Sequence, residues 1–275
     1  MSEAGALVSS EAVDRAATRE HWGVNSFKPG EMAWIDRLGN LRNVVRQEVI
    51  ARQIAPLARP GITVLDVGCG QGTQALRLAS AGCKVTAVDP SADLLGLLSD
   101  DVIAGRLDVE LLQGRIENVG DLCGGRMFDL VCCHGVMMYL DDWVQALRDL
   151  SERLTIDGRM SVTFRNGRAL AMRPGLRGEW AAALSAFHSM AYVNELGLPA
   201  RAHRTDEIEG ALTSAGLRPV AWYGVRVLTD AVPVDAPPPD PDSLALLLDA
   251  EEQAGATEPY KWMASQLHVI AEAAR

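Results

Sequence analysis

Residues 62–89 read ITVLDVGCGQGTQALRLASAGCKVTAVD, and this stretch decides the fold class. ITVLDV and KVTAVD are short apolar runs rich in β-branched residues, a pattern typical of strands that are buried on both faces of a parallel sheet. Between them, TQALRLASAGC has helical spacing and follows a glycine-rich turn. The order of strand, turn, helix and strand predicts a right-handed βαβ unit.

The same alternation continues on both sides of this unit. An amphipathic helix is expected before it, over residues 41–57. Further strands and helices alternate after it, which predicts an α/β, doubly wound, Rossmann-like domain. The expected strands are 109–114, 127–136, 159–166, 218–228 and 267–273, and the expected helices are 92–105, 141–155, 204–217 and 243–255.

The chain is expected to hold one core domain with two attachments. Residues 1–38 are predicted to form an N-terminal arm or helical extension, and residues 39–275 the domain itself. Alternation stops over 167–204, where GEWAAALSAFHSMAYVNELGLP (178–199) is interpreted as a helical insertion that forms a lid. The aromatic residues of this insertion are expected to form its own core, although they could also stack a nucleobase: Trp180, Phe187 and Tyr192. A Pro-rich loop is predicted over 231–242.

Composition narrows the possible function classes. The 275 residues are 48% hydrophobic and 23% charged, which excludes disorder as the main state. The net charge of −10 argues against non-specific electrostatic binding of nucleic acid by the whole protein surface. No signal-peptide pattern and no apolar run of about 20 residues is present, so we expect a cytoplasmic protein without a membrane span. Five cysteines without CxxC spacing favour a reduced protein.

The candidate ligand-binding residues lie at the carboxyl edge of the first two predicted strands, where open α/β sheets bind ligands. The turn after the first strand supplies five candidate cofactor-binding residues: Asp66, Gly68, Cys69, Gly70 and Gly72. Its glycines allow close approach of backbone to a ligand. Asp89 ends the second strand, where a carboxylate can accept both ribose hydroxyls of an adenosine. The sequence therefore predicts a cofactor that contains adenosine.

The pattern VLDVGCGQG (64–72) resembles the first motif of the class I S-adenosylmethionine (SAM)-dependent methyltransferases. FDLV (128–131) is similar to the fourth strand of that family, and LTIDG (154–158) to the turn before its fifth. The resemblance implies a seven-stranded, mostly parallel sheet with an antiparallel last strand. It also implies SAM as the cofactor, S-adenosylhomocysteine (SAH) as the product, and no metal.

A narrower resemblance extends from about Gly39 to the C-terminus. It is carried by GNLRNVV (39–45), CHGVMMYLDD (133–142), FRNGRALAM (164–172), GVRV (224–227) and EPY with HV (258–269). In this order they are similar to the tRNA 5-carboxymethoxyuridine methyltransferases, which methylate a carboxylate on a wobble uridine. The resemblance implies these cofactor contacts: Arg42, Gly68, Cys69, Asp89, Ile116, Glu117 and His134.

Four residues are candidates for the catalytic side of the site. His134, at the end of the fourth strand, is interpreted first as a cofactor contact, then as a general base, then as a strand-end histidine with a structural role. Tyr139 could border the acceptor cavity or cover the sheet edge. Arg165 and Arg226 are favoured over Arg201 for holding an acceptor carboxylate or an RNA phosphate.

Two acceptors follow from these observations. The narrower resemblance predicts a methyl ester on 5-carboxymethoxyuridine, with tRNA as partner. The alternative is O- or carboxyl methylation of a small molecule in secondary or lipid metabolism. The net charge, the apolar insertion and the pair Met138-Tyr139, which stands where the tRNA family has Glu-Trp, favour this alternative. Oxygen is the acceptor atom in both.

Overall fold

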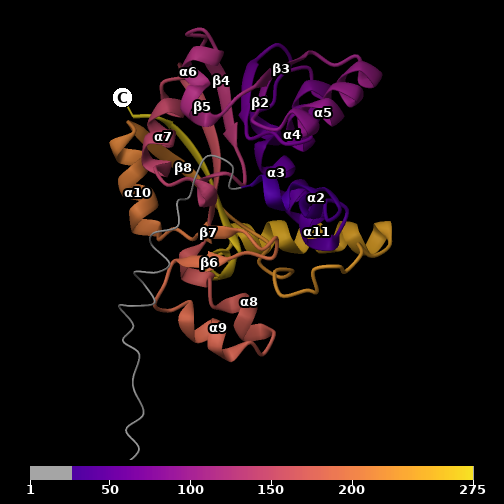
Figure 1. Ribbon diagram of the computed structural model, residues 1–275, viewed down its shortest axis with the longest axis vertical. Coiled ribbons are helices and arrows are strands. Elements are labelled where there is room, and N and C mark those ends of the chain that lie inside the picture. The colour runs from indigo at the N-terminus through magenta and orange to yellow at the C-terminus, as the bar shows by residue number, and fades with distance from the viewer. Residues whose placement is uncertain (1–26, 275) are drawn as a thin grey trace, which may run out of the picture.

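The computed structural model describes residues 27–274 and contains a seven-stranded sheet among them (Figure 1). The strand order is β3-β2-β1-β4-β5-β9-β8. Strands β3, β2, β1, β4 and β5 are mutually parallel, and β9 runs antiparallel to both β5 and β8. The predicted doubly wound α/β fold with one reversed last strand is therefore confirmed.

The strands are β1 (Thr63–Val67), β2 (Lys84–Asp89), β3 (Val109–Gln113), β4 (Phe128–Cys133), β5 (Leu154–Arg165), β6 (Ala191–Val193), β7 (Pro199–Arg201), β8 (Leu217–Val225) and β9 (Gln266–Ala273). The α-helices are α2 (Glu31–Ile35), α3 (Leu41–Ile54), α4 (Thr73–Ser80), α5 (Ala92–Gly105), α6 (Val119–Leu122), α7 (Trp143–Ser151), α8 (Met172–Leu176), α9 (Trp180–Ser185), α10 (Thr205–Ser214) and α11 (Pro241–Ala256). Short 3-10 helices are η1 (Lys28–Gly30), η2 (Ala55–Leu57), η3 (Ile116–Asn118), η4 (Met137–Tyr139), η5 (Gly167–Ala169) and η6 (Tyr260–Met263).

Helices cover both faces of the main sheet. The helices α6, α7 and α10 pack on one face, and α3, α4 and α5 pack on the other (Figure 1). Helix α11 lies against α3 and β8 on the second side. Because both faces are covered, the parallel strands are apolar along most of their length, as ITVLDV and KVTAVD indicated.

The insertion over residues 167–204 lies beyond the carboxyl ends of the strands (Figure 1). It is less helical than predicted, since 178–199 contains only α9 and then enters the β6–β7 hairpin. The Asn194–Gly197 turn, with Gly197 at positive φ, forms the hairpin. The prediction of an aromatic core in the insertion is wrong for Trp180 and Phe187, which are 72% and 69% exposed. Of the predicted arm 1–38, residues 1–26 lie outside the described residues.

The turn after β1 depends on glycines in the left-handed region. Gly72, which caps α4, has φ +83°, and a Cβ there would lie 2.2 Å from Leu98 Cδ1 in α5. A Cβ added to Gly68, which has φ +71°, would lie 2.3 Å from the Val136 side chain. The turn thus packs too closely against its neighbours for any larger residue.

We expect Gly72→Ala to lower the free energy of unfolding by about 3 kcal/mol, because it combines left-handed strain with overpacking. Gly96→Ala is the matched control. Gly96 lies on the exposed face of α5 with open space around it, so alanine there should raise stability by up to about 1 kcal/mol. Urea titration measures both, and equal effects of the two variants would contradict this account of the turn.

Candidate active site

A cavity of about 500 Å³ opens at the carboxyl edge of the sheet. Its volume lies within the range of small-molecule sites. The ends of β1, β2, β4 and β5 form its floor, α3 forms one wall, and the insertion contributes to the roof. The predicted site residues that line it are Arg42, Gly68, Gly70, Asp89, Ile116, Glu117, His134, Tyr139, Arg165 and Arg226.

Asp89 marks the acidic half of the cavity. Its carboxylate accepts hydrogen bonds from the backbone N–H groups of Gly70 (2.8 Å) and Ser91 (2.9 Å). Burial raises the pKa of Asp89, and the charge of Glu31 adds to this effect. Each carboxylate oxygen keeps a lone pair for a ligand, because these N–H groups use only part of its hydrogen-bonding capacity.

Asp66 lies beneath the turn and does not line the cavity. Burial and, to a smaller extent, the charge of Asp89 raise the pKa of Asp66 to about 7, although a hydrogen bond from the Ala75 backbone N–H partly opposes them. The hydrogen bond from the Ala75 backbone N–H to Asp66 connects the end of β1 to α4. Cys69 and Gly72 also lie outside the cavity lining and shape the turn from behind.

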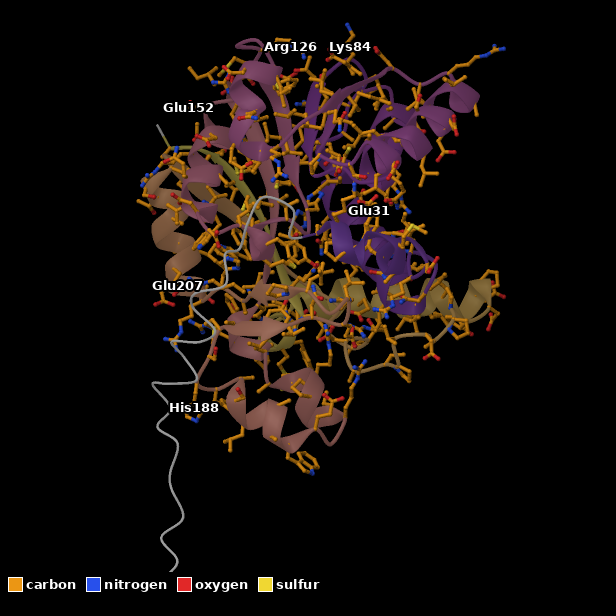
Figure 2. All side chains as sticks on the ribbon, in the orientation of Figure 1. Glu31, Lys84, Arg126, Glu152, His188 and Glu207 are labelled. Carbon is orange, nitrogen blue, oxygen red and sulfur yellow. The ribbon has the colours of Figure 1, made fainter. Side chains whose placement is uncertain are left out.

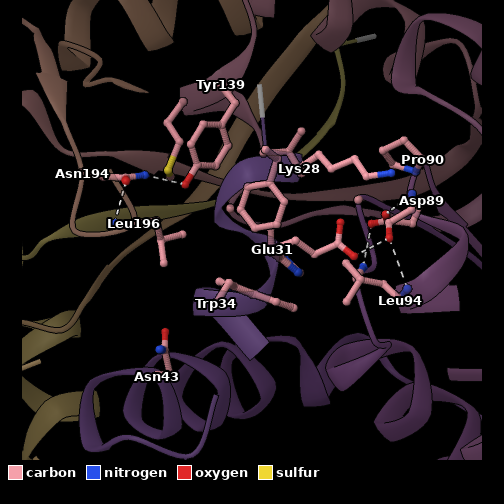
Figure 3. Close-up of a pocket in the computed structure, with 18 of the residues that line it drawn as sticks. Lys28, Glu31, Trp34, Asn43, Asp89, Pro90, Leu94, Tyr139, Asn194 and Leu196 are labelled. Atoms are coloured by element: carbon pink, nitrogen blue, oxygen red, sulfur yellow. Dashed lines mark hydrogen bonds between the residues drawn. The ribbon is translucent and has the colours of Figure 1, made fainter. Parts of the chain in front are cut away.

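Residues 27–38, which we call the N-terminal strap, form a cavity wall that the sequence did not predict. In Figure 3, Glu31 and Trp34 lie on the same side of the cavity, with Glu31 directed toward Asp89. Glu31 is buried and accepts a hydrogen bond from Ser91 Oγ (2.7 Å). The Trp34 ring lies so close to Gly70 that a Cβ there would approach it to 2.8 Å.

The opposite half of the cavity carries four arginines, which we call the arginine group: Arg42, Arg165 and Arg226, which are buried, and Arg173, whose side chain is 13% exposed. All four pair with Asp230, at 2.7 Å for Arg173 and 3.4–3.7 Å for the others. Glu195, from the insertion, pairs with Arg42 (2.6 Å) and Arg173 (3.2 Å). Glu195 also pairs with Arg177 (2.7 Å), so five guanidinium groups share two carboxylates, which leaves this half of the cavity positive.

The pKa shifts reflect this imbalance. Burial would raise the pKa of Asp230, but Arg226, Arg165 and Arg173 outweigh it and hold that pKa well below its ordinary value. Burial lowers the pKa of Arg226 to about 9, because Asp230 compensates only partly for burial and for the neighbouring arginines. The Nε atoms of Arg165 and Arg226 are buried and have no hydrogen-bond partner. The arginine group is thus suited to an anionic ligand.

Arg226 is held in an unusual backbone conformation. Its φ is +59°, a value that disfavours an arginine unless its surroundings impose it. Fully buried Glu251 of α11 accepts hydrogen bonds from the backbone N–H groups of the next three residues, 227–229, at 2.7–3.1 Å. Glu251 thereby fixes the segment that carries both Arg226 and Asp230.

His134 stands at the head of a buried hydrogen-bond chain. His134 Nε2 lies 2.8 Å from Ser161 Oγ, which lies 2.7 Å from His268 Nε2, and His268 Nδ1 lies 2.6 Å from Gln53 Oε1. Because Gln53 Oε1 only accepts, the proton of His268 sits on Nδ1, and Ser161 must donate to His268. His134 then donates from Nε2, and its Nδ1, which has no partner, is a free acceptor.

Burial, with a smaller contribution from Arg46, lowers the pKa of His134 to about 3. His134 therefore stays neutral above about pH 4, and we expect kcat/KM to show no limb near the ordinary histidine pKa of about 6.5. A pH–rate profile from pH 5.5 to 8.5, recorded for the wild type and His134→Gln, measures this. A wild-type limb near pH 6.5 that vanishes in His134→Gln would contradict it.

Two further candidates differ in placement. Tyr139 lines the cavity, and its hydroxyl accepts a hydrogen bond from Asn194 Nδ2 of the insertion at 2.8 Å (Figure 3). Arg201 lies outside the cavity lining and pairs with Glu207 (3.2 Å), which Figure 2 places at the outer surface. The preference for Arg165 and Arg226 over Arg201 as cavity residues is consistent with this arrangement.

No cluster of three or more His, Cys, Asp or Glu side chains with metal-binding geometry occurs among residues 27–274. None of the helices in that part of the chain has the length and apolar character that a bilayer span requires.

Parts of the chain are similar to a known protein family and to curated proteins. Residues 64–158 match the family profile described as "Methyltransferase domain". Ubiquinone biosynthesis O-methyltransferases of Xanthomonas campestris and Azorhizobium caulinodans are 29% and 30% identical, over 45% and 47% of this chain. The matched regions cover 50% and 51% of those proteins, so the chain spans about half the length of the curated relatives it matches.

Solved structures match over most of the chain. The 1,6-didemethyltoxoflavin-N1-methyltransferase of Burkholderia thailandensis, solved with its substrate and SAH, has a TM-score of 0.58 at 19% identity, covering 99% of this chain and 94% of that one. The magnesium protoporphyrin IX methyltransferase of Synechocystis, solved with SAH, has a TM-score of 0.56 at 16% identity, covering 94% and 98%. The chain thus has the fold of the class I SAM-dependent methyltransferases, with a match to the methyltransferase domain over residues 64–158.

Proposed function

We propose that the protein is a SAM-dependent methyltransferase that transfers a methyl group to an oxygen of a carboxylate acceptor. The proposal rests on one observation. A single cavity holds the carboxylate of Asp89, which is of the kind that binds ribose hydroxyls, at one end and the arginine group at the other. The methyltransferase-domain match and the neighbours solved with SAH support the cofactor assignment.

The residues at the acidic end fit SAM. Asp89 would accept the two ribose hydroxyls, and Ile116 and Glu117 of η3 line the cavity beside it. The cradle of Gly68 and Gly70 leaves no room for a Cβ, so the backbone can pass close to the amino-acid part of the cofactor. When bound, SAM supplies an electrophilic methyl group on a sulfonium centre.

The protein then has to hold an acceptor in line with that methyl group. Arg165 and Arg226 present guanidinium groups that can orient a carboxylate. An ionised carboxylate needs no general base, in keeping with a neutral His134 that donates from Nε2 to Ser161 and offers its Nδ1 only as an acceptor. The strap and the insertion would exclude water, and positioning of this kind can supply roughly 7–11 kcal/mol.

For the acceptor itself we put forward two candidates. The first is 5-carboxymethoxyuridine in tRNA, supported by the sequence motifs over residues 39–269. The second is a small carboxylic acid, supported by the net charge of −10 and by a cavity that both the strap and the insertion border. Both present the same group, a carboxylate, to the arginine group.

Methyl transfer from radiolabelled SAM tests the proposal. One arm uses tRNA from a strain that carries unesterified carboxymethoxyuridine, followed by mass spectrometry of the nucleosides. The other arm uses a metabolite extract, followed by separation of labelled products. In each arm, mild base should release the label as volatile methanol, because methyl esters hydrolyse readily whereas methyl ethers and N-methyl groups do not.

Base-labile label on the uridine supports the tRNA acceptor, and base-labile label on a metabolite supports the small-molecule acceptor. Label that resists base would contradict the carboxylate assignment while leaving the methyltransferase in place. Failure of the wild type to bind SAH in calorimetry would contradict the cofactor assignment and with it the proposed function.

A further inference from the structure

Arg46 lies on α3, four residues after Arg42, and lines the cavity. Residues four apart on a helix share a face, so both arginines face the carboxyl edge of the sheet. A Cβ built on Gly135 would lie 3.3 Å from Arg46 Nη1, which places the guanidinium against the backbone directly after His134. Arg46 therefore lies near the middle of the cavity, between Asp89 and Arg226.

Arg46 differs from the other arginines of α3 in having no partner. Arg42 pairs with Glu195 and Asp230, and exposed Arg52 pairs with Asp249 and Glu252. Among residues 27–274, no hydrogen bond or ion pair to Arg46 is present, and its Nε is buried and unsatisfied. Burial lowers the pKa of Arg46, and the effect is offset in part by Tyr139 but by no carboxylate.

Arg46 is partly buried, and a partly buried guanidinium without a counter-ion destabilises a fold, since removing a charge from water is unfavourable unless that charge is paired. Such a group is explained when a ligand supplies the missing anion. We propose that Arg46 binds a carboxylate of a ligand in this cavity. This inference rests on the proposed function, which offers two sources of that carboxylate: the amino-acid part of the cofactor, and the acceptor.

The charge distribution favours the cofactor as the source. Arg42, which the sequence resemblance assigns to the cofactor, already pairs with Glu195 and Asp230, although it shares both carboxylates with other arginines. Arg46 is the cation on the same helix face that remains available to a new anion. It also adjoins Gly135 and His134, across the end of β4 from the Gly68 turn against which the cofactor's amino-acid part would lie.

The test compares SAH with its decarboxylated analogue, which keeps the amine and lacks only the carboxylate. We expect Arg46→Leu in the full chain to weaken SAH binding by about 10- to 100-fold and to change binding of the analogue less than twofold. Arg46→Lys, which keeps the charge, should restore part of the loss. Arg52→Leu, on the same helix, is the matched control and should bind both ligands as the wild type does.

The same variants identify the other source. Unchanged SAH binding with a KM at least tenfold higher for carboxymethoxyuridine tRNA, or for the labelled metabolite, assigns the carboxylate to the acceptor. Unchanged SAH binding and unchanged KM overturn the role of Arg46 alone. A wild type that fails to bind SAH overturns the proposed function together with this inference.

Thermal melting separates a ligand-binding role from a structural one. Because Arg46 makes no ion pair in the described part of the chain, Arg46→Leu should melt at the same temperature as the unliganded wild type or above it. Its stabilisation by added SAH should be smaller than that of the wild type. A variant that melts several degrees lower, with an undiminished response to SAH, would show that Arg46 supports the fold instead.

Discussion

Asp89→Ala is expected to weaken SAH binding by roughly 1,000-fold. The carboxylate at the end of β2 would accept two ribose hydroxyls, and each hydrogen bond to a charged group contributes about 1.5–3 kcal/mol. Asp89 also accepts the backbone N–H groups of Gly70 and Ser91, so its loss loosens the loop against which the ligand lies. Calorimetry with SAH measures the change.

Two companion variants control for indirect effects. Asp89→Asn keeps the size and one acceptor, so we expect a smaller loss, near 100-fold, with the fold intact. Asp101→Ala removes an exposed carboxylate from α5 and should bind SAH as the wild type does. Equal affinity of Asp89→Ala and Asp101→Ala would contradict the placement of the ribose.

Arg226→Leu is expected to reduce kcat/KM for the acceptor by roughly 100- to 1,000-fold while SAH affinity changes less than twofold. Truncating one partner of a buried charge pair typically costs 2–5 kcal/mol, which corresponds to about this range. Asp230 keeps Arg42, Arg165 and Arg173 as partners in the variant, so the fold should survive.

Arg218→Leu is the matched control for this variant. Arg218 lies on the same strand, β8, and pairs at the surface with Glu272, so its loss should leave acceptor turnover unchanged. Steady-state kinetics at saturating SAM, with the acceptor identified by labelling, measures both variants. A tenfold loss of SAH affinity in Arg226→Leu would place Arg226 at the cofactor instead and contradict the division of the cavity.

The sequence predicted the parts of the site that lie within one local motif. β1, the glycine turn, α4 and β2 follow one another without interruption, so burial pattern and turn chemistry together place Asp89 and Gly70 at one edge. Arg165 and Arg226 lie within predicted strands that are readable from their own apolar patterns, and in the structure Arg165 ends β5 and Arg226 directly follows β8.

The missed parts depend on contacts between distant segments. Nothing local in 27–38 indicates that Trp34 packs on Gly70, since that contact joins α2 to the turn after β1, on the far side of α3 in the sequence. The pairing of Glu195 with Arg42 likewise joins segments more than 150 residues apart. The four-residue spacing of Arg42 and Arg46 was a usable signal, because it puts both side chains on one helix face.

A crystal structure of the protein with SAH is the most direct test of the account. We predict the ribose hydroxyls on Asp89, the amino-acid carboxylate on Arg46, and the sulfur facing the half of the cavity that holds Arg165 and Arg226. SAH bound with its ribose among the arginine group, or absent from the cavity at saturating concentration, would contradict the assignment of this site to SAM-dependent methyl transfer.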